Sequence, residues 1–263
     1  MHAAEREKTI LALLEAKGFV AFRDLERALD ASAATLRRDL ERLAAEGVIT
    51  RVHGGASLAP PATDAPSPAA NSLSGVPFHE NIERHRDEKI AIGRVAAGLC
   101  MPGEGVMIDG GSTTLQMCPH LKGLNLQVLT NSLHIASALL GQAGTRLLLP
   151  GGAVFPEQNI ILSAVGEDLM PRFHAPKLFM GAAAVGPQGL MQADVVLVAA
   201  ERRLIERAEK VVLLVDSSKF EASSGYVVCG LEEVDIVVSD WRLSGDAREM
   251  LERAGVEVVV AGA

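Results

Sequence analysis

Residues 106–114 read Val-Met-Ile-Asp-Gly-Gly-Ser-Thr-Thr, a short apolar run followed at once by an aspartate, two glycines and three hydroxyl side chains. The apolar half is typical of a strand that is buried on both faces of a parallel sheet. The polar half is typical of a loop at the carboxyl end of such a strand, where open α/β sheets bind their ligands. The stretch therefore predicts both a fold class and the place of a site.

The same alternation continues through the rest of the chain. Short runs rich in aliphatic residues predict further strands at 126–130, 146–149, 178–180, 211–215, 236–239 and 256–260. Amphipathic segments between them predict helices at 89–99, 133–140, 201–209 and 247–253. This order indicates an α/β fold, with a mostly parallel sheet covered by helices on both faces. Aromatic residues make up only 3% of the chain, so the core must be largely aliphatic.

Small polar residues also follow three of the other predicted strands, as Thr130-Asn131-Ser132, Gly151-Gly152 and Asp216-Ser217-Ser218-Lys219. Glycine amides and a helix N-terminus expected at Ser112–Thr114 would attract an anion, and Lys219 would supply the counter-charge. Asp109 and Asn131 could bind hydroxyl groups of the same ligand. Small residues at strand ends are also ordinary turns, but four such loops at successive strand ends favour a phosphate site.

A proline-rich segment divides the chain. Residues 58–77 contain five of its 12 prolines and few large apolar residues, which is typical of a semi-extended linker. A structureless loop of this length inside one compact domain is uncommon. We therefore expect an N-terminal domain at 1–57, a linker at 58–77 and a larger α/β domain at 78–263.

The N-terminal part has helical periodicity. Apolar spacing predicts helices around 10–14 and over 23–29, and a third that begins at Ser32, a good N-cap, and ends at Gly47. Residues 48–52 then predict a strand that runs into two glycines. Three helices followed by a hairpin are the order of a winged helix-turn-helix domain.

One face of the third predicted helix is polar. Leu36, Leu40 and Leu43 would be buried, which places Thr35, Arg38 and Arg42 on the opposite side, with Arg37 beside them. Arginines near the start of a recognition helix read guanine in the major groove. Alternatively, the face is merely solvated and Arg37 pairs with Glu41.

The sequence of residues 5–57 resembles the N-terminal domain of the DeoR family of bacterial transcriptional regulators. The strings that carry the resemblance are Ser32-x-x-Thr35-Leu36-Arg37-Arg38-Asp39-Leu40 and Arg51-Val52-His53-Gly54-Gly55-Ala56. The resemblance implies DNA contacts by Ser32, Thr35, Arg37 and Arg38, with Arg51 and His53 in the wing near the DNA backbone. Asp30 and Ala31 depart from the family pattern, and we expect a looser turn and an intact fold.

The four strand-end loops are similar to those of the C-terminal sensor domain of the same family, a relative of ribose-5-phosphate isomerase. The resemblance implies a sugar-phosphate-responsive regulator, usually a repressor of a carbohydrate or polyol pathway. The predicted effector-binding residues are Asp109, Gly111, Ser112, Thr113, Thr114, Asn131, Ser132, Gly151, Gly152 and Lys219. Pro176, Leu197 and Glu201 depart from the family pattern.

Composition excludes other classes of protein. The first 58 residues have as many basic as acidic side chains, so the rest of the chain carries the net charge of −8, and DNA contact needs a local patch. We found no P-loop motif, no apolar run long enough to cross a membrane and no histidine pair at metal-ligand spacing. The three cysteines are read as reduced thiols, and we expect a cytoplasmic protein without cofactor or metal.

The sequence thus predicts a regulator that binds double-stranded operator DNA and a small phosphorylated sugar. One winged domain without net charge has little non-specific affinity, so we expect a homodimer or homotetramer. An alternative is an active sugar-phosphate isomerase with a DNA-binding appendage, for which Asp109 or Asp216 would be the base. Another is a sensor that has lost its ligand. Turnover of ribose 5-phosphate would distinguish the isomerase from a regulator that only binds its ligand.

Overall fold

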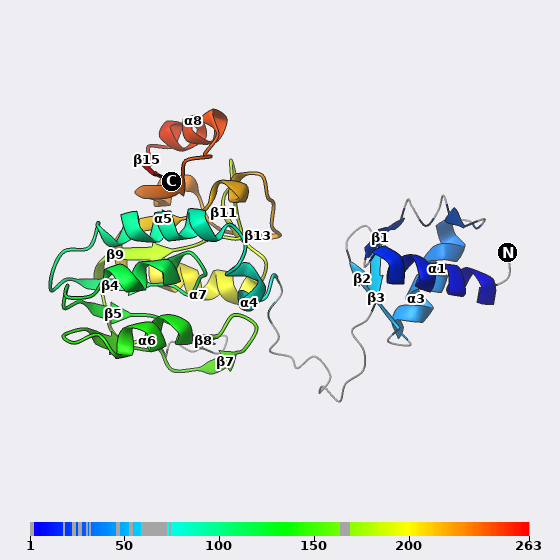
Figure 1. Ribbon diagram of the computed structural model, residues 1–263, viewed down its shortest axis with the longest axis horizontal. Helices are drawn as coiled ribbons and strands as arrows, with labels where there is room; N and C mark the ends of the chain where they lie inside the picture. Colours follow the sequence, from blue (N-terminus) through cyan, green and yellow to red (C-terminus); the bar gives the residue numbers. More distant parts are fainter. Residues whose placement is uncertain are drawn as a thin grey trace. The chain divides into compact units, whose positions relative to one another are not determined.

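The computed structural model describes residues 3–17, 19–22, 25, 28–29, 31, 33–45, 48–52, 55–58, 73, 75–163 and 169–262 (Figure 1). The chain separates into two compact units, residues 1–68 and 69–263. Among the described helices, none is long and apolar enough to cross a membrane.

The described residues of the N-terminal unit form two helices and a small antiparallel sheet in the strand order β1-β3-β2. Its described elements are α1 (Ala3–Lys17), β1 (Phe19–Ala21), α3 (Ala33–Ala45), β2 (Ile49–Val52) and β3 (Gly55–Leu58). Leu36, Leu40 and Leu43 are buried in its core, as the periodicity predicts. The predicted helix at 23–29 lies mostly outside the described residues, although Leu25 and Leu29 are buried. The β2–β3 hairpin is the predicted wing.

The C-terminal unit is built on a seven-stranded sheet in the order β15-β14-β12-β9-β4-β5-β6, and every pair in it is parallel. The predicted α/β fold is confirmed, because the seven predicted strands are the seven strands of this sheet. Their bounds are β4 (Gly105–Ile108), β5 (Gln127–Leu129), β6 (Arg146–Leu148), β9 (Ala175–Met180), β12 (Ala208–Leu214), β14 (Ile236–Asp240) and β15 (Glu257–Ala261).

Helices cover both faces of the sheet. Side chains of α5 (Arg86–Ala97), the 3-10 helix η1 (Thr114–His120) and α6 (Leu133–Leu140) share one apolar cluster with alternate strand residues such as Val106 and Ile108. Side chains of α7 (Val195–Ile205) and α8 (Gly245–Arg253) share the opposite cluster with Met107. Successive residues of β4 therefore point to opposite faces, and both faces are buried.

Two structural details correct the sequence prediction. The predicted helix at 201–209 begins earlier and ends earlier, because the Asp194 side chain caps the backbone N–H of Val196 and Ala208 already begins β12. A helix N-terminus is predicted at Ser112–Thr114. The helix found there is the 3-10 helix η1, and its first residue is Thr114.

The C-terminal unit also contains short elements that the periodicity does not reveal. A second antiparallel sheet has the order β10-β11-β13, and β7 pairs with β8 in a hairpin. The bounds are α4 (Phe78–Asn81), β7 (Ala153–Phe155), β8 (Ile160–Leu162), β10 (Ala184–Gly186), β11 (Gly189–Gln192), the 3-10 helices η2 (Ser217–Phe220) and η3 (Leu231–Glu233), and β13 (Tyr226–Cys229).

The last residues of the predicted linker pack on the C-terminal unit. Leu73 is buried in an apolar cluster that includes Ile160 and Leu162. The Gln158 side-chain amide donates a hydrogen bond to the Val76 carbonyl oxygen at 2.9 Å. Residues just before Phe78 are therefore held against the β7–β8 hairpin.

Helix α5 approaches η1 so closely that one position requires glycine. A Cβ added to Gly93 would lie 2.5 Å from the backbone carbon of Gln116. Since η1 continues directly from the loop at 110–113, this contact holds that loop against the sheet.

We predict that Gly93→Ala destabilises the C-terminal unit by about 1–3 kcal/mol through overpacking, although glycine-to-alanine changes in helices are usually favourable. Gly141→Ala is the control, because a Cβ there meets no atom within 4 Å. Urea denaturation followed by circular dichroism measures both variants. Equal stability of Gly93→Ala and wild type would contradict the close packing.

Candidate functional site

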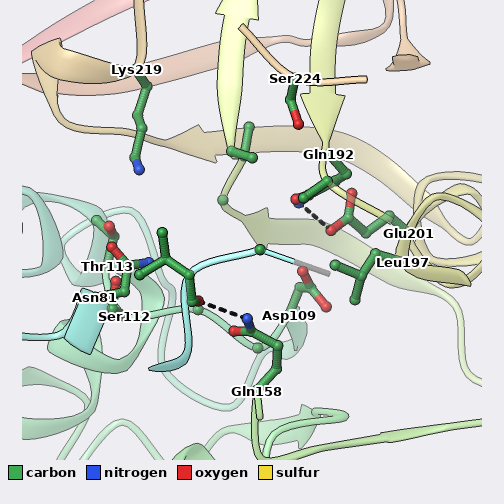
Figure 2. A pocket seen from close by; sticks show the side chains of 18 of the residues that line it. Asn81, Asp109, Ser112, Thr113, Gln158, Gln192, Leu197, Glu201, Lys219 and Ser224 are labelled. Atoms are coloured by element: carbon green, nitrogen blue, oxygen red, sulfur yellow. Dashed lines mark hydrogen bonds between the residues drawn. The ribbon is translucent and has the colours of Figure 1, made fainter. Parts of the chain in front are cut away.

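A cavity of about 450 Å³ lies at the carboxyl ends of the central parallel strands (Figure 2). Asp109 and Gly110 reach it from the end of β4, Asn131 from the end of β5, and Gly181 from the end of β9. Lys219 reaches it from η2, which follows β12. Strands far apart in sequence thus contribute to one pocket, because parallel strands end at one edge of the sheet.

A hydrogen-bonded clamp fixes the base of this pocket. Asn131 Nδ2 donates to Asp109 Oδ1 at 2.7 Å, and the Gly110 backbone N–H donates to Asn131 Oδ1 at 2.8 Å. Thr114 Oγ1 donates to the Asp109 carbonyl oxygen at 2.8 Å. A Cβ on Gly110 would come within 2.5 Å of Ile160 Cγ2, so this turn of the loop requires glycine. The acceptor atoms are therefore in place before any ligand arrives.

One side of the pocket is basic. Figure 2 shows Lys219 reaching in on the side of Asn81, Ser112 and Thr113. Arg84 also lines the cavity. These groups combine a lysine ammonium with small hydroxyl side chains, which is a donor set suited to a phosphate.

Lys89 stands behind the basic side. Its side chain is fully buried, and its Nζ donates to the Asn81 carbonyl oxygen at 2.5 Å and to Asn81 Oδ1 at 3.3 Å. Burial lowers the pKa of Lys89 to about 8, a shift that Lys219 and Arg84 reinforce and Asp216 opposes. Lys89 thus positions Asn81, and the ligand-facing charge belongs to other residues.

The opposite side of the pocket is acidic. Burial raises the pKa of Asp109 to about 6, and the hydrogen bond from Asn131 partly offsets this effect. Burial and the neighbouring Asp109 carboxylate raise the pKa of Glu201 well above its ordinary value. Gln192 Nε2 donates to Glu201 Oε1 at 2.6 Å, as Figure 2 shows. Two buried carboxyl groups therefore face the same cavity.

The structure brings together some of the predicted effector residues and not others. Those that line the cavity are Asp109, Gly111, Ser112, Thr113, Asn131 and Lys219. Thr114 and Ser132 do not line it, since Thr114 braces the loop and Ser132 caps α6 by accepting from the Ile135 N–H. Gly151 and Gly152 do not line it either, because they follow β6 at the edge of the sheet, and Gly152 packs against Leu162.

Several residues that line the cavity are absent from the predicted effector-binding set. The additional polar ones are Asn81, Arg84, His85, Gln158, Gln192, Ser223 and Ser224, together with Ser218 of a predicted loop and Glu201, which departs from the family pattern. The segment at 81–85 precedes α5 and carries a run of charged residues that is most simply read as a solvated helix start. Glu201 lies one helical turn after Leu197, which also lines the cavity. The packing of α7 turns these two positions toward the cavity, with Leu197 against the cluster that includes Ile160 and Leu162.

The predicted DNA-binding face is partly described. Arg38 is exposed and Thr35 is half-buried on α3, on the side away from the leucine face. Arg42 Nη2 lies 2.6 Å from Glu7 Oε2, so it also ties α3 to α1. Arg6 and Asp39 form a second such pair at 2.7 Å. Ser32 and His53 and the side chains of Arg37 and Arg51 lie outside the described residues.

Among the described residues, no group of three or more histidine, cysteine, aspartate or glutamate side chains could hold a metal ion. Cys100, Cys118 and Cys229 are buried free thiols, and burial raises the pKa of each to about 12. The described residues that line the cavity thus offer hydrogen-bonding and charged side chains.

Comparison with known proteins matches both units. Residues 84–241 match the model of the DeoR C terminal sensor domain, and residues 6–61 match the model of the DeoR-like helix-turn-helix domain. A protein of Escherichia coli O157:H7 whose name proposes it as the aga operon transcriptional repressor is 28% identical over 98% of this chain and 94% of its own. The HTH-type transcriptional regulator UlaR of Shigella dysenteriae serotype 1 is 28% identical over 98% of this chain and 99% of its own.

Among solved structures, ribose 5-phosphate isomerase A of Methanocaldococcus jannaschii aligns with 51% of this chain and 54% of its own, at 17% identity and a TM-score of 0.37.

The acidic side of the pocket predicts a pH-dependent stability. The folded pKa of both carboxyls exceeds the unfolded value, so the native state holds protons that the unfolded state releases. The free energy of unfolding therefore falls as pH rises from about 4 through the folded pKa. The rise of the Asp109 pKa to about 6 corresponds to a loss of about 3 kcal/mol.

We predict that Glu201→Gln gains stability relative to wild type as pH rises from 4 to 7.5, as measured by urea denaturation, because the amide keeps the Gln192 contact without a buried charge. Glu206→Gln, exposed at the end of the same helix, controls for the loss of one negative charge. Parallel curves of unfolding free energy against pH for Glu201→Gln and wild type would contradict a raised pKa at Glu201.

Proposed function

The chain belongs to the DeoR family of transcriptional regulators, and from that premise we propose that it represses a carbohydrate or polyol catabolic operon until a phosphorylated sugar releases it from the operator. The winged helix-turn-helix unit would bind double-stranded DNA through α3 and the β2–β3 wing. The observation that carries the effector proposal is the cavity that places Lys219 and the clamped Asp109–Asn131 pair around one space.

We assign the effector phosphate to the basic side of this cavity. The phosphate would be surrounded by Lys219, Asn81, Arg84 and the backbone of the 111–113 loop. The ammonium of Lys219 would supply a charge-assisted hydrogen bond. Asp109 and Asn131 would hold sugar hydroxyls, for which the carboxylate and amide oxygens are acceptors. In this proposal the pocket binds its ligand without transforming it.

Coupling between effector and operator would run through the residues that join the two units. Gly75 and Val76 line the cavity, and the chain that precedes them leads to the DNA-binding unit. An effector that contacts these residues would change their position or their mobility. Either change would alter which arrangements of the two units the connecting segment allows. Two or more copies per operator, as a homodimer or homotetramer, would then convert a modest shift per copy into release.

The DNA-binding part of the proposal predicts the effect of a single side chain. Arg38→Ala should weaken binding to an operator selected from random DNA by about 1–3 kcal/mol, if the guanidinium contacts a base edge. Folding should be unchanged, since Arg38 is exposed. Lys8→Ala on α1 removes the same charge from an exposed position of the same unit and should keep near-normal affinity. Equal affinities of the two variants would exclude Arg38 from recognition.

The effector part predicts a repressor that no longer responds. For the sugar phosphate that most raises the melting temperature of the protein, Lys219→Ala should lose about tenfold to hundredfold in affinity, whereas operator binding without effector persists. Lys210→Ala, exposed near the opposite end of β12, is the matched control.

Calorimetric titrations with and without operator test the same switch. Because coupling between two binding sites is reciprocal, operator should weaken effector binding by the factor by which effector weakens operator binding. Unchanged affinity in Lys219→Ala would place the phosphate elsewhere. Equal wild-type affinity with and without operator would remove the switch.

A further inference from the structure

Glu201 presents a carboxyl oxygen that has no hydrogen-bond partner among the described residues. The residue is only 3% exposed, and its Oε1 accepts a hydrogen bond from Gln192, but Oε2 is buried and unpaired. The side chain lines the cavity. Leaving a buried carboxyl oxygen unpaired costs free energy, so a ligand that donates a hydrogen bond to Oε2 gains that energy on binding.

Asp109 adds a second carboxyl group to the same side of the cavity. Its Oδ1 accepts from Asn131, and the residue is 5% exposed. Among the described cavity-lining residues, the basic side chains are Arg84, His85 and Lys219. Figure 2 shows Lys219 across the pocket from Glu201, with Leu197 and Gln192 as the labelled neighbours of Glu201. Lys219, the basic residue that Figure 2 labels, therefore lies away from the acidic side.

The cavity thus has a basic side at Lys219 and, opposite to it, an acidic side at Glu201 and Asp109. We propose that the effector is the phosphate ester of an amino sugar, with its phosphate at Lys219 and its ammonium at Glu201 and Asp109. This inference rests on the proposed function, because it takes a sugar phosphate as the occupant. A cavity of about 450 Å³ is within the range for a small ligand such as a hexose phosphate.

The chemistry favours an ammonium over the other groups that a sugar carries. A hydroxyl donates one hydrogen bond and carries no charge, so it leaves the second carboxyl without compensation. An ammonium has three donors and one positive charge, and charge-assisted hydrogen bonds are roughly twice as strong as neutral ones. A carboxylate, as in an aldonic or uronic acid phosphate, would be repelled by the ionised Asp109 carboxylate and would bring no positive charge to this side.

Matched pairs of ligands test the inference on the intact protein. Glucosamine 6-phosphate and glucose 6-phosphate differ only in an ammonium or a hydroxyl, and so do galactosamine 6-phosphate and galactose 6-phosphate. In isothermal titration calorimetry at pH 7, we expect the amino member of at least one pair to bind about tenfold more tightly or better.

The outcomes separate this inference from the proposed function. Binding of both members of each pair with equal affinity, or a preference for the hydroxyl, would overturn the amino-sugar assignment and leave a sugar-phosphate sensor standing. Failure of all four compounds to bind would count against the sugar-phosphate effector as well as against the amino group.

Substitution of Glu201 locates the preference. Glu201→Gln should remove the preference by lowering the affinity for the amino sugar phosphate about tenfold. The affinity for the matching hexose phosphate should stay within about twofold, and this result would show that the pocket is intact. Glu206→Gln should keep the wild-type preference. An amino-sugar preference that survives in Glu201→Gln would overturn the proposed role of Glu201.

Discussion

The hydrogen bond from Asn131 to Asp109 joins the ends of two neighbouring parallel strands, and the geometry of the pocket depends on it. The same asparagine accepts from the Gly110 N–H, so one side chain orients both the carboxylate and the start of the next loop. Neither group can turn away without leaving buried polar atoms unpaired. A ligand therefore meets acceptors that are already placed, and little of its binding energy is lost to ordering them.

This preorganisation has a cost in stability. Asp109, Glu201 and Lys89 are nearly or fully buried, and burial shifts the pKa of each toward its neutral form. A core made only of aliphatic residues would avoid these penalties. Retaining buried titratable groups around one cavity is typical of a site that recognises a charged ligand.

The proposed link between the two binding events depends on the position of the pocket. Its wall includes Gly75 and Val76, which follow the segment between the two units. The Gln158 amide on the Val76 carbonyl oxygen and the buried Leu73 side chain hold this stretch on the C-terminal unit. A ligand in the cavity would lie directly beside it.

The sequence by itself determined the seven parallel strands, the leucine face of α3 and three residues that line the pocket, Asp109, Asn131 and Lys219. These features are local: aliphatic runs, helical spacing and small polar residues after a strand are each read within a few residues. The short strands of the β10-β11-β13 sheet escaped prediction, since three or four residues carry too little periodicity.

Only the tertiary structure decided which loops share the cavity. The order of strands in the sheet is not their order in the chain, so the glycines after β6 lie at an edge while the loop after β12 reaches the site. The tertiary structure also decided the place of Glu201. Helical spacing predicts which residues share its face of the helix, but not which part of the protein that face covers. Strand order and helix docking depend on contacts between residues far apart in sequence, and those contacts form only when the whole unit packs.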